Sequence, residues 1–177
     1  MKTKMRLTTL KLLFLAALFV ASTSCNQKAD SVVETKDQAE SGILPSEKPD
    51  YFLLHPKLEK MYGFSQAVRI GNTVKISGTV SIDEDGKTLG KGNLLQQMKN
   101  IYVDLGTILN HYHCTFDDVM VENLFTTNMK ELQKNAAFRH EIYKNHFPTG
   151  SWIGVKELGL PEMMIEIEIE ALIPEKG

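Results

Sequence analysis

The closing stretch of the chain, MMIEIEIEALIP at residues 163–174, constrains the fold more than any other segment. Glu166, Glu168 and Glu170 alternate there with isoleucine residues. Successive side chains of a β-strand point to opposite faces, so this pattern predicts a strand with one apolar face and one acidic face. Other elements must cover the apolar face of such a sheet, and the alternation alone places all three glutamates on a solvated face.

Three further segments have the periodicity or composition of strands. Residues 67–83, AVRIGNTVKISGTVSID, alternate on both sides of the Gly71-Asn72 pair, which predicts a hairpin with a tight turn. Residues 119–127, VMVENLFTT, and residues 151–158, SWIGVKEL, are rich in β-branched and aromatic residues. Together with the closing segment, they predict a sheet of five or six strands.

Two segments have the three- and four-residue spacing of apolar positions that is typical of amphipathic helices. The first covers residues 93–112. The second covers residues 128–147, with Asn128 as its N-cap and Pro148 at its end. Glu131 stands three residues after the cap, where it is placed to complete a capping box.

The order of these elements predicts one α+β domain over residues 50–177, with both helices on one face of the sheet. The other face then needs its own cover. Self-association, with sheets packed around a symmetry axis, is a natural solution for a domain of this size.

Residues 1–24 have the pattern of a signal peptide. Four basic residues precede an apolar run of ten residues, Leu12 to Ala21, and small residues follow at the cleavage end. A run of ten is too short to span a membrane as a helix, because spanning requires roughly 20 residues.

Cys25 follows this segment directly, and VASTSC resembles the lipobox of bacterial lipoproteins. A lipid on Cys25 would anchor the protein without a spanning helix, and residues 25–49 would form the anchored cysteine and a flexible tether. The chain is therefore expected to be an exported, membrane-anchored lipoprotein of a bacterial cell envelope. A plain secreted protein with an incidental cysteine is the alternative.

Charge and residue spacing argue against two classes of partner. Removal of the four basic residues of the signal peptide lowers the formal charge from −2 to −6, which gives no electrostatic attraction for nucleic acid. The histidine pairs His111/His113 and His140/His146 lack the spacing of metal ligands on a helix, so no metal site is expected. Cys114 is either a nucleophile or a buried, inert thiol, and the second reading is the more common one.

Four segments follow one another in a specific order: FSQAVRIGNTVKISG, QMKNIYVDLGTIL, the stretch from TFDDVMVENLF to HFP, and the closing EIEALI. In this order they resemble the reactive-intermediate deaminase family of Rid or YjgF-type proteins. The likeness extends over about residues 62–174. It implies a chorismate-mutase-like α+β fold and a homotrimer with three small-molecule clefts between subunits. In active members these clefts hydrolyse imines and enamines derived from amino acids, with no metal or organic cofactor.

The resemblance also assigns roles to individual residues. Glu168 matches the glutamate that positions or activates the attacking water, because Glu168-Ile169-Glu170-Ala171 matches the family's ending. Asn135 matches the family's helix asparagine. These two matches favour a working site.

Other positions depart from the family's pattern. Gly150, followed by Ser151, stands where the family has the arginine that binds the substrate carboxylate, and Phe64 stands at the family's tyrosine. Trp152 replaces a smaller residue two positions after the arginine site. Either Phe64 and Trp152 line an apolar pocket, or they belong to the core.

The missing arginine leaves three functional hypotheses. A charge-assisted contact to a carboxylate contributes about 1.5–3 kcal/mol, so an unmodified imino-acid site is not expected. The chain is either a deaminase-like enzyme of altered specificity, a non-catalytic small-molecule-binding lipoprotein, or a trimeric scaffold.

Overall fold

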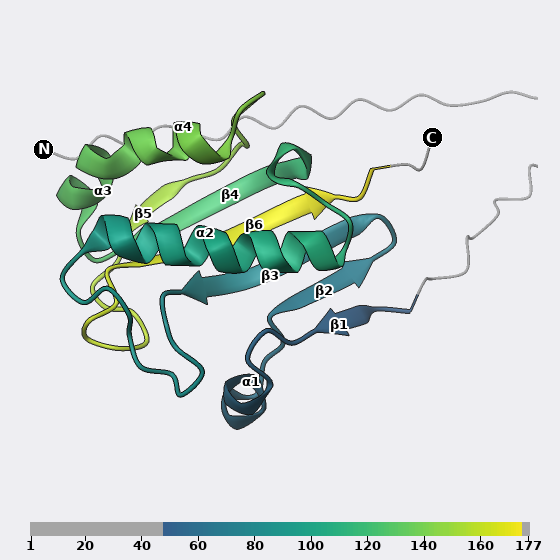
Figure 1. Ribbon diagram of the computed structural model, residues 1–177, viewed down its shortest axis with the longest axis horizontal. Coiled ribbons are helices and arrows are strands. Elements are labelled where there is room, and N and C mark those ends of the chain that lie inside the picture. The colour runs from purple at the N-terminus through teal and green to yellow at the C-terminus, as the bar shows by residue number, and fades with distance from the viewer. Residues whose placement is uncertain (1–47, 175–177) are drawn as a thin grey trace, which may run out of the picture. The chain divides into compact units, whose positions relative to one another are not determined.

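The computed structural model describes residues 48–174, and the predicted signal peptide, Cys25 and most of the predicted tether lie outside this range. The described part forms a six-stranded sheet in the order β1-β2-β3-β6-β4-β5. Helix α2 runs across this sheet (Figure 1). The strands are β1 (Asp50–Phe52), β2 (Ala67–Ile70), β3 (Thr73–Val80), β4 (Val119–Thr126), β5 (Trp152–Gly154) and β6 (Ile165–Leu172).

The predicted hairpin and the closing strand lie side by side in the sheet. β2 and β3 pair antiparallel, and β6 inserts between β3 and β4, antiparallel to both. Ile169 of β6 lies opposite Ile76 of β3 on one side and opposite Glu122 of β4 on the other. The short β5 runs parallel to β4 at the edge of the sheet.

The first predicted helix is confirmed as α2 (Leu94–His111). The Asn93 side chain accepts a hydrogen bond from the Gln96 backbone and caps its first turn. The buried side of α2 packs on β3 and β6, where the isoleucines of the closing strand are less than 2% exposed. The core of this packing contains Met98, Ile101, Leu105, Ile108, Leu109, Ile165, Ile167 and Ile169.

The second predicted helix is present only in pieces, so the prediction of one helix to residue 147 is wrong. It consists of α3 (Met129–Asn135), a 3₁₀ turn η2 (Ala136–Phe138) and α4 (Arg139–Ile142). Asn128 caps α3, but its own backbone N–H donates to Thr126 Oγ1, so the capping box does not form. After Ile142 the chain turns extended, and this change accompanies the binding of the Tyr143 hydroxyl to a buried carboxylate.

The segment before the hairpin contains two elements that the periodicity did not predict. β1 extends the sheet beside β2, and the short helix α1 (Pro56–Tyr62) follows it. Pro56 at the start of α1 and the left-handed Gly63 at its end are ordinary helix boundary signals. The helix is too short to show a clear apolar period.

The α+β prediction is confirmed, with α2 and α3 packed together beside the sheet. In the part of the chain that the structure describes, no helix is long and apolar enough to cross a membrane. The sheet face away from α2 carries the acidic side of β6.

A cleft on the uncovered face of the sheet

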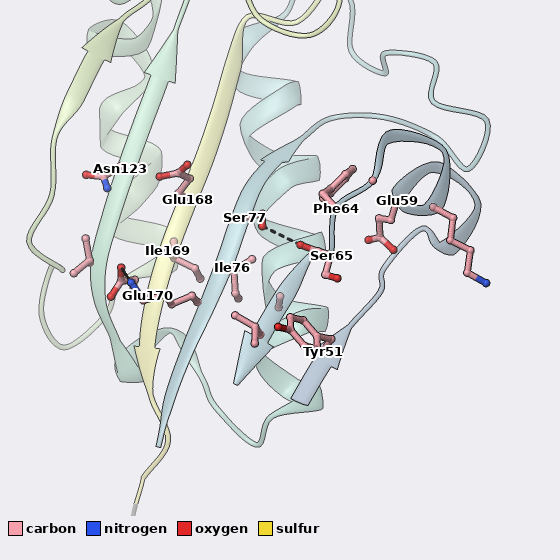
Figure 2. Close-up of a pocket in the computed structure, with 16 residues that line it drawn as sticks. Tyr51, Glu59, Phe64, Ser65, Ile76, Ser77, Asn123, Glu168, Ile169 and Glu170 are labelled. Carbon is pink, nitrogen blue, oxygen red and sulfur yellow. Dashed lines mark hydrogen bonds and ion pairs between the residues drawn. The ribbon is translucent and has the colours of Figure 1, made fainter. Parts of the chain in front are cut away.

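A cavity of about 650 Å³ lies on this uncovered face. β3, β6 and β4 form one side of it, and α1 with the segment that follows forms the other (Figure 2). Helix α2 lies behind the sheet in this view. The polar and charged residues that line it are Glu59, Lys60, Ser65, Lys75, Ser77, Asn123, Glu168 and Glu170.

Glu168 is placed in the cleft by the register of β6. It lies opposite Asn123 of β4, and both line the cavity. The Glu168 carboxylate forms no hydrogen bond or ion pair with any residue between 48 and 174. Glu170, two residues on, accepts a 2.9 Å contact from Lys75 Nζ. Glu168 is therefore available to a water molecule or a ligand in a way that Glu170 is not.

Glu166 differs from both of these glutamates. Burial raises the pKa of its carboxyl group above the usual value, and the neighbouring Glu168 raises it further. It lies beside Gly78 of β3, where the β3–β6 register shifts between Ile76 and Thr79. The three glutamates that sequence alternation treats as equivalent thus have three different environments.

The irregular part of β3 also fixes the opposite wall of the cleft. Ser77 Oγ donates to the Ser65 carbonyl oxygen at 3.0 Å, as Figure 2 shows. Gln66 Nε2 donates to the Ser77 carbonyl oxygen and to Thr79 Oγ1. These bonds hold the segment that carries Phe64, which lines the cavity and is 43% exposed.

Glu59 of α1 is a third acidic residue of the cleft, and the sequence did not indicate it. The side chain is 1% exposed, and its Oε1 accepts hydrogen bonds from the Leu54 and His55 backbones at 2.8 and 3.3 Å. Oε2 has no hydrogen-bond partner within the described residues. The periodicity of the sequence did not predict α1, so no sequence signal placed Glu59 near the cleft.

The other predicted site residues do not line this cavity. Ser151 contacts it only indirectly, because its backbone N–H donates to Asn123 Oδ1. Asn135 donates its side-chain amide to the Glu131 carbonyl oxygen within α3. Trp152 pairs with Leu124, and its ring lies 5.8 Å from the guanidinium carbon of Arg139.

Gly150 has a backbone that suits glycine alone. Its φ is +159°, and a Cβ built on it would overlap the main-chain carbonyl of Glu122. A residue with a side chain fits at this position only if the backbone shifts. The backbone at position 150 therefore leaves no room for an arginine side chain.

Arg139, which the sequence could not place, is engaged elsewhere. It forms an ion pair with Glu122, whose side chain is fully buried, and Arg139 Nε donates to Glu122 Oε2 at 2.7 Å. The hydroxyls of Tyr102 and Tyr143 both donate to Glu122 Oε1 at 2.7 Å. Burial, followed by the charge of Glu122, raises the pKa of both tyrosines.

Two further predictions concern metal and thiol chemistry. No group of three His, Cys, Asp or Glu residues is placed to hold a metal ion in the described range. Cys114 is buried, and burial followed by the charge of Asp118 raises the pKa of its thiol. The prediction that Cys114 is buried is confirmed, and a thiol with a raised pKa forms less of the nucleophilic thiolate.

The fold and this cleft define a class: α+β sheet proteins with an acidic cleft on the face that the helices leave open. Residues 56–173 match the family described as Endoribonuclease L-PSP, and the chain belongs to this family, the Rid or YjgF family that the motifs indicated.

Relatives of known name support this assignment. The RutC family protein YjgH of Escherichia coli is 29% identical over 114 residues, which cover 64% of this chain and 85% of YjgH. The solved structure of YJGH superposes with a TM-score of 0.60 over 72% of this chain and 95% of that one, at 27% identity. A protein of Dermatophagoides farinae named 2-iminobutanoate/2-iminopropanoate deaminase is 24% identical over 62% of this chain and 84% of its own length.

Proposed function

We propose that this protein is a deaminase-like hydrolase of C=N bonds whose substrate differs from the imino acids. The observation that carries the proposal is the unpaired Glu168 carboxylate in the cleft. Such a carboxylate can accept a proton from water as the water oxygen attacks the carbon of an imine. The overall step adds one water to R₂C=NH and releases R₂C=O and ammonia.

The charges around the cleft support the altered specificity. Position 150 carries no side chain, and Arg139 is paired with the buried Glu122. Two lysines line the cleft: Lys75 is paired with Glu170, and Lys60 is an exposed residue of α1. A substrate carboxylate in this cleft would face Glu168 without a bidentate guanidinium to bind it. An imine that lacks a carboxylate avoids this repulsion.

The proposed assembly is a homotrimer with a cleft at each subunit interface. The uncovered, acidic face of the sheet supports it, because a partner packed there would enclose the cleft. Asn135, Gly150, Ser151 and Trp152, which do not line the cavity of their own subunit, would then belong to the clefts of neighbouring subunits. Cys25 would hold this trimer at an envelope membrane, on the exported side.

Non-catalytic binding is the second candidate, and the mostly apolar residues between Glu168 and α1 support it. The family description names an endoribonuclease, but three carboxylates, Glu59, Glu168 and Glu170, outnumber the two lysines, Lys60 and Lys75, that line this cleft. This excess of negative charge disfavours the phosphates of RNA, and the charge of −6 without the signal peptide acts in the same direction. RNA hydrolysis is therefore not proposed.

Ammonia release is the direct test. Imines would be generated in situ, 2-iminopropanoate from alanine by an amino acid oxidase and a carboxylate-free imine from a primary amine by an amine oxidase. We expect the protein to accelerate ammonia release from the second imine and not from the first. Glu168→Gln should lower this rate about 10²- to 10⁴-fold, the usual contribution of a general base.

Glu170→Gln provides the matched control, since it lies on the same strand face but is paired with Lys75. Its rate should stay close to that of the wild type. Fast turnover of 2-iminopropanoate would disprove the altered specificity. A lack of turnover with every imine, together with binding, would favour the non-catalytic alternative.

A further inference from the structure

A second, smaller hollow of about 250 Å³ adjoins the cleft. Phe64 lines both cavities and therefore stands between them. The walls of the hollow are mainly apolar, and Glu166 is the only residue with a formal charge at neutral pH among those that line it. The apolar side chains include Leu58, Val80, Ile82, Leu160 and Met163, and Tyr62 adds a second aromatic ring. We refer to this hollow as the Glu166 groove.

The carboxyl group of Glu166 reaches this groove because β3 is irregular and has a glycine there. The β3–β6 register shifts between Ile76 and Thr79, which leaves Gly78 beside Glu166. A Cβ at position 78 would overlap Glu166 Oε1. The carboxyl group thus occupies the space that any other residue at position 78 would fill.

Glu166 is also electrostatically unsatisfied. Within residues 48–174 it forms no hydrogen bond or ion pair, whereas Glu162 and Glu170 pair with Lys91 and Lys75 at 3.0 and 2.9 Å. It is partly buried, and its neighbour on the same strand face is the carboxylate of Glu168. A cation in the groove would offset both the desolvation and this repulsion.

We infer that the Glu166 groove binds a small organic ammonium ion with an apolar or aromatic body. The ammonium group would donate to the Glu166 carboxylate, and the body would pack on Leu58, Phe64 and Met163. The exposed rings of Tyr62 and Phe64 add a surface that attracts cations. A carboxylate of the same shape would instead meet the charges of Glu166 and Glu168.

This site requires no hydrolysis, so it can be tested separately from the proposed function. Benzylammonium, benzyl alcohol and benzoate have similar rings and differ in charge. Their binding to the purified full chain would be measured by isothermal titration calorimetry at pH 7.5. We expect benzylammonium to bind about tenfold more tightly than benzyl alcohol, as a charge-assisted contact in a partly exposed site provides, and benzoate to bind most weakly.

Three variants locate the interaction. Glu166→Gln should remove the preference for the cation, and Gly78→Ala should weaken it by displacing the carboxyl group. Glu170→Gln, a carboxylate on the same strand face that does not line the groove, should keep the full preference. Circular dichroism spectra and melting temperatures close to the wild-type values would show that the variants fold.

Equal affinity for all three probes, or a preference that survives in Glu166→Gln, would overturn the inference. If only Glu168→Gln abolished the preference for benzylammonium, the cation would bind in the main cleft, and this result would also overturn the inference. Ammonia release by Glu166→Gln separates the two proposals. If it stays at the wild-type level while cation binding is lost, the groove and the hydrolytic site are distinct.

Discussion

Two carboxylates on neighbouring strands of one sheet have opposite surroundings. Glu122 of β4 is covered, and one arginine and two tyrosine hydroxyls satisfy both its oxygens. Glu168 of β6 lies on the uncovered face with no partner in the described residues. A buried charge persists only where its hydrogen-bonding capacity is filled, so Glu122 is part of the scaffold. An unpaired carboxylate in an open cleft has its capacity free for a ligand.

The largest expected effect comes from a substitution that removes one partner of the buried Glu122 carboxylate. Arg139→Ala leaves Glu122 buried with two tyrosine hydroxyls but no cation, and loss of one partner of a buried pair costs about 3–5 kcal/mol. The free energy of unfolding would be measured by urea denaturation. Lys75→Ala, which breaks the exposed pair with Glu170, should cost at most about 1 kcal/mol. Equal losses of unfolding free energy in the two variants would mean that the buried Glu122–Arg139 pair stabilises the fold no more than the exposed Lys75–Glu170 pair does.

The next effect concerns the position where the family has its arginine. Gly150→Ala should destabilise the protein by about 1–3 kcal/mol, because a Cβ there overlaps the main chain of Glu122. Gly154→Ala in β5 is the control, since a Cβ at that position meets nothing within 4 Å. Thermal unfolding of both variants would compare them.

The same geometry predicts the outcome of restoring the arginine. Gly150→Arg should lose stability to a similar extent and should not by itself hydrolyse 2-iminopropanoate, because the shifted backbone does not hold the guanidinium in place. A stable Gly150→Arg variant with rapid turnover of that imine would show that the backbone adapts easily, and that the loss of the arginine alone set the specificity.

The comparison of the two carboxylates also shows what sequence reasoning could and could not reach. Strict alternation located β6 and its buried isoleucines, because periodicity is a local property of the chain. Motif order then singled out Glu168. The ion pair of Glu122 with Arg139 joins residues 17 positions apart across two elements, and no local pattern encodes which arginine reaches which carboxylate.

Other features were missed for related reasons. A bulge changes which side chains face each other, so the register at Gly78 and the groove beside it follow only from the paired strands. Glu59 lines the cleft because α1 folds beside the sheet. The sequence of a seven-residue helix does not indicate which tertiary contact the helix makes. Trp152 shares a strand face with residue 150 in the sequence pattern, but the β4–β5 register places it opposite the buried Leu124.

The smallest expected effect is on the pH dependence of stability at Glu166, a third glutamate that can be compared with Glu122 and Glu168. Its folded-state pKa is raised by burial and then by Glu168, so between the unfolded value near 4.5 and the raised value the folded state binds more protons. Stability should therefore fall as pH increases through this window, and Glu166→Gln should remove that fall. At neutral pH the variant should be more stable than the wild type by less than about 1 kcal/mol, because the site is partly solvated. The difference should vanish below pH 4.5, and urea denaturation at several pH values would measure it. A variant that is less stable at neutral pH would mean that Glu166 has a favourable partner in the folded protein, and that it belongs with Glu122 as part of the scaffold.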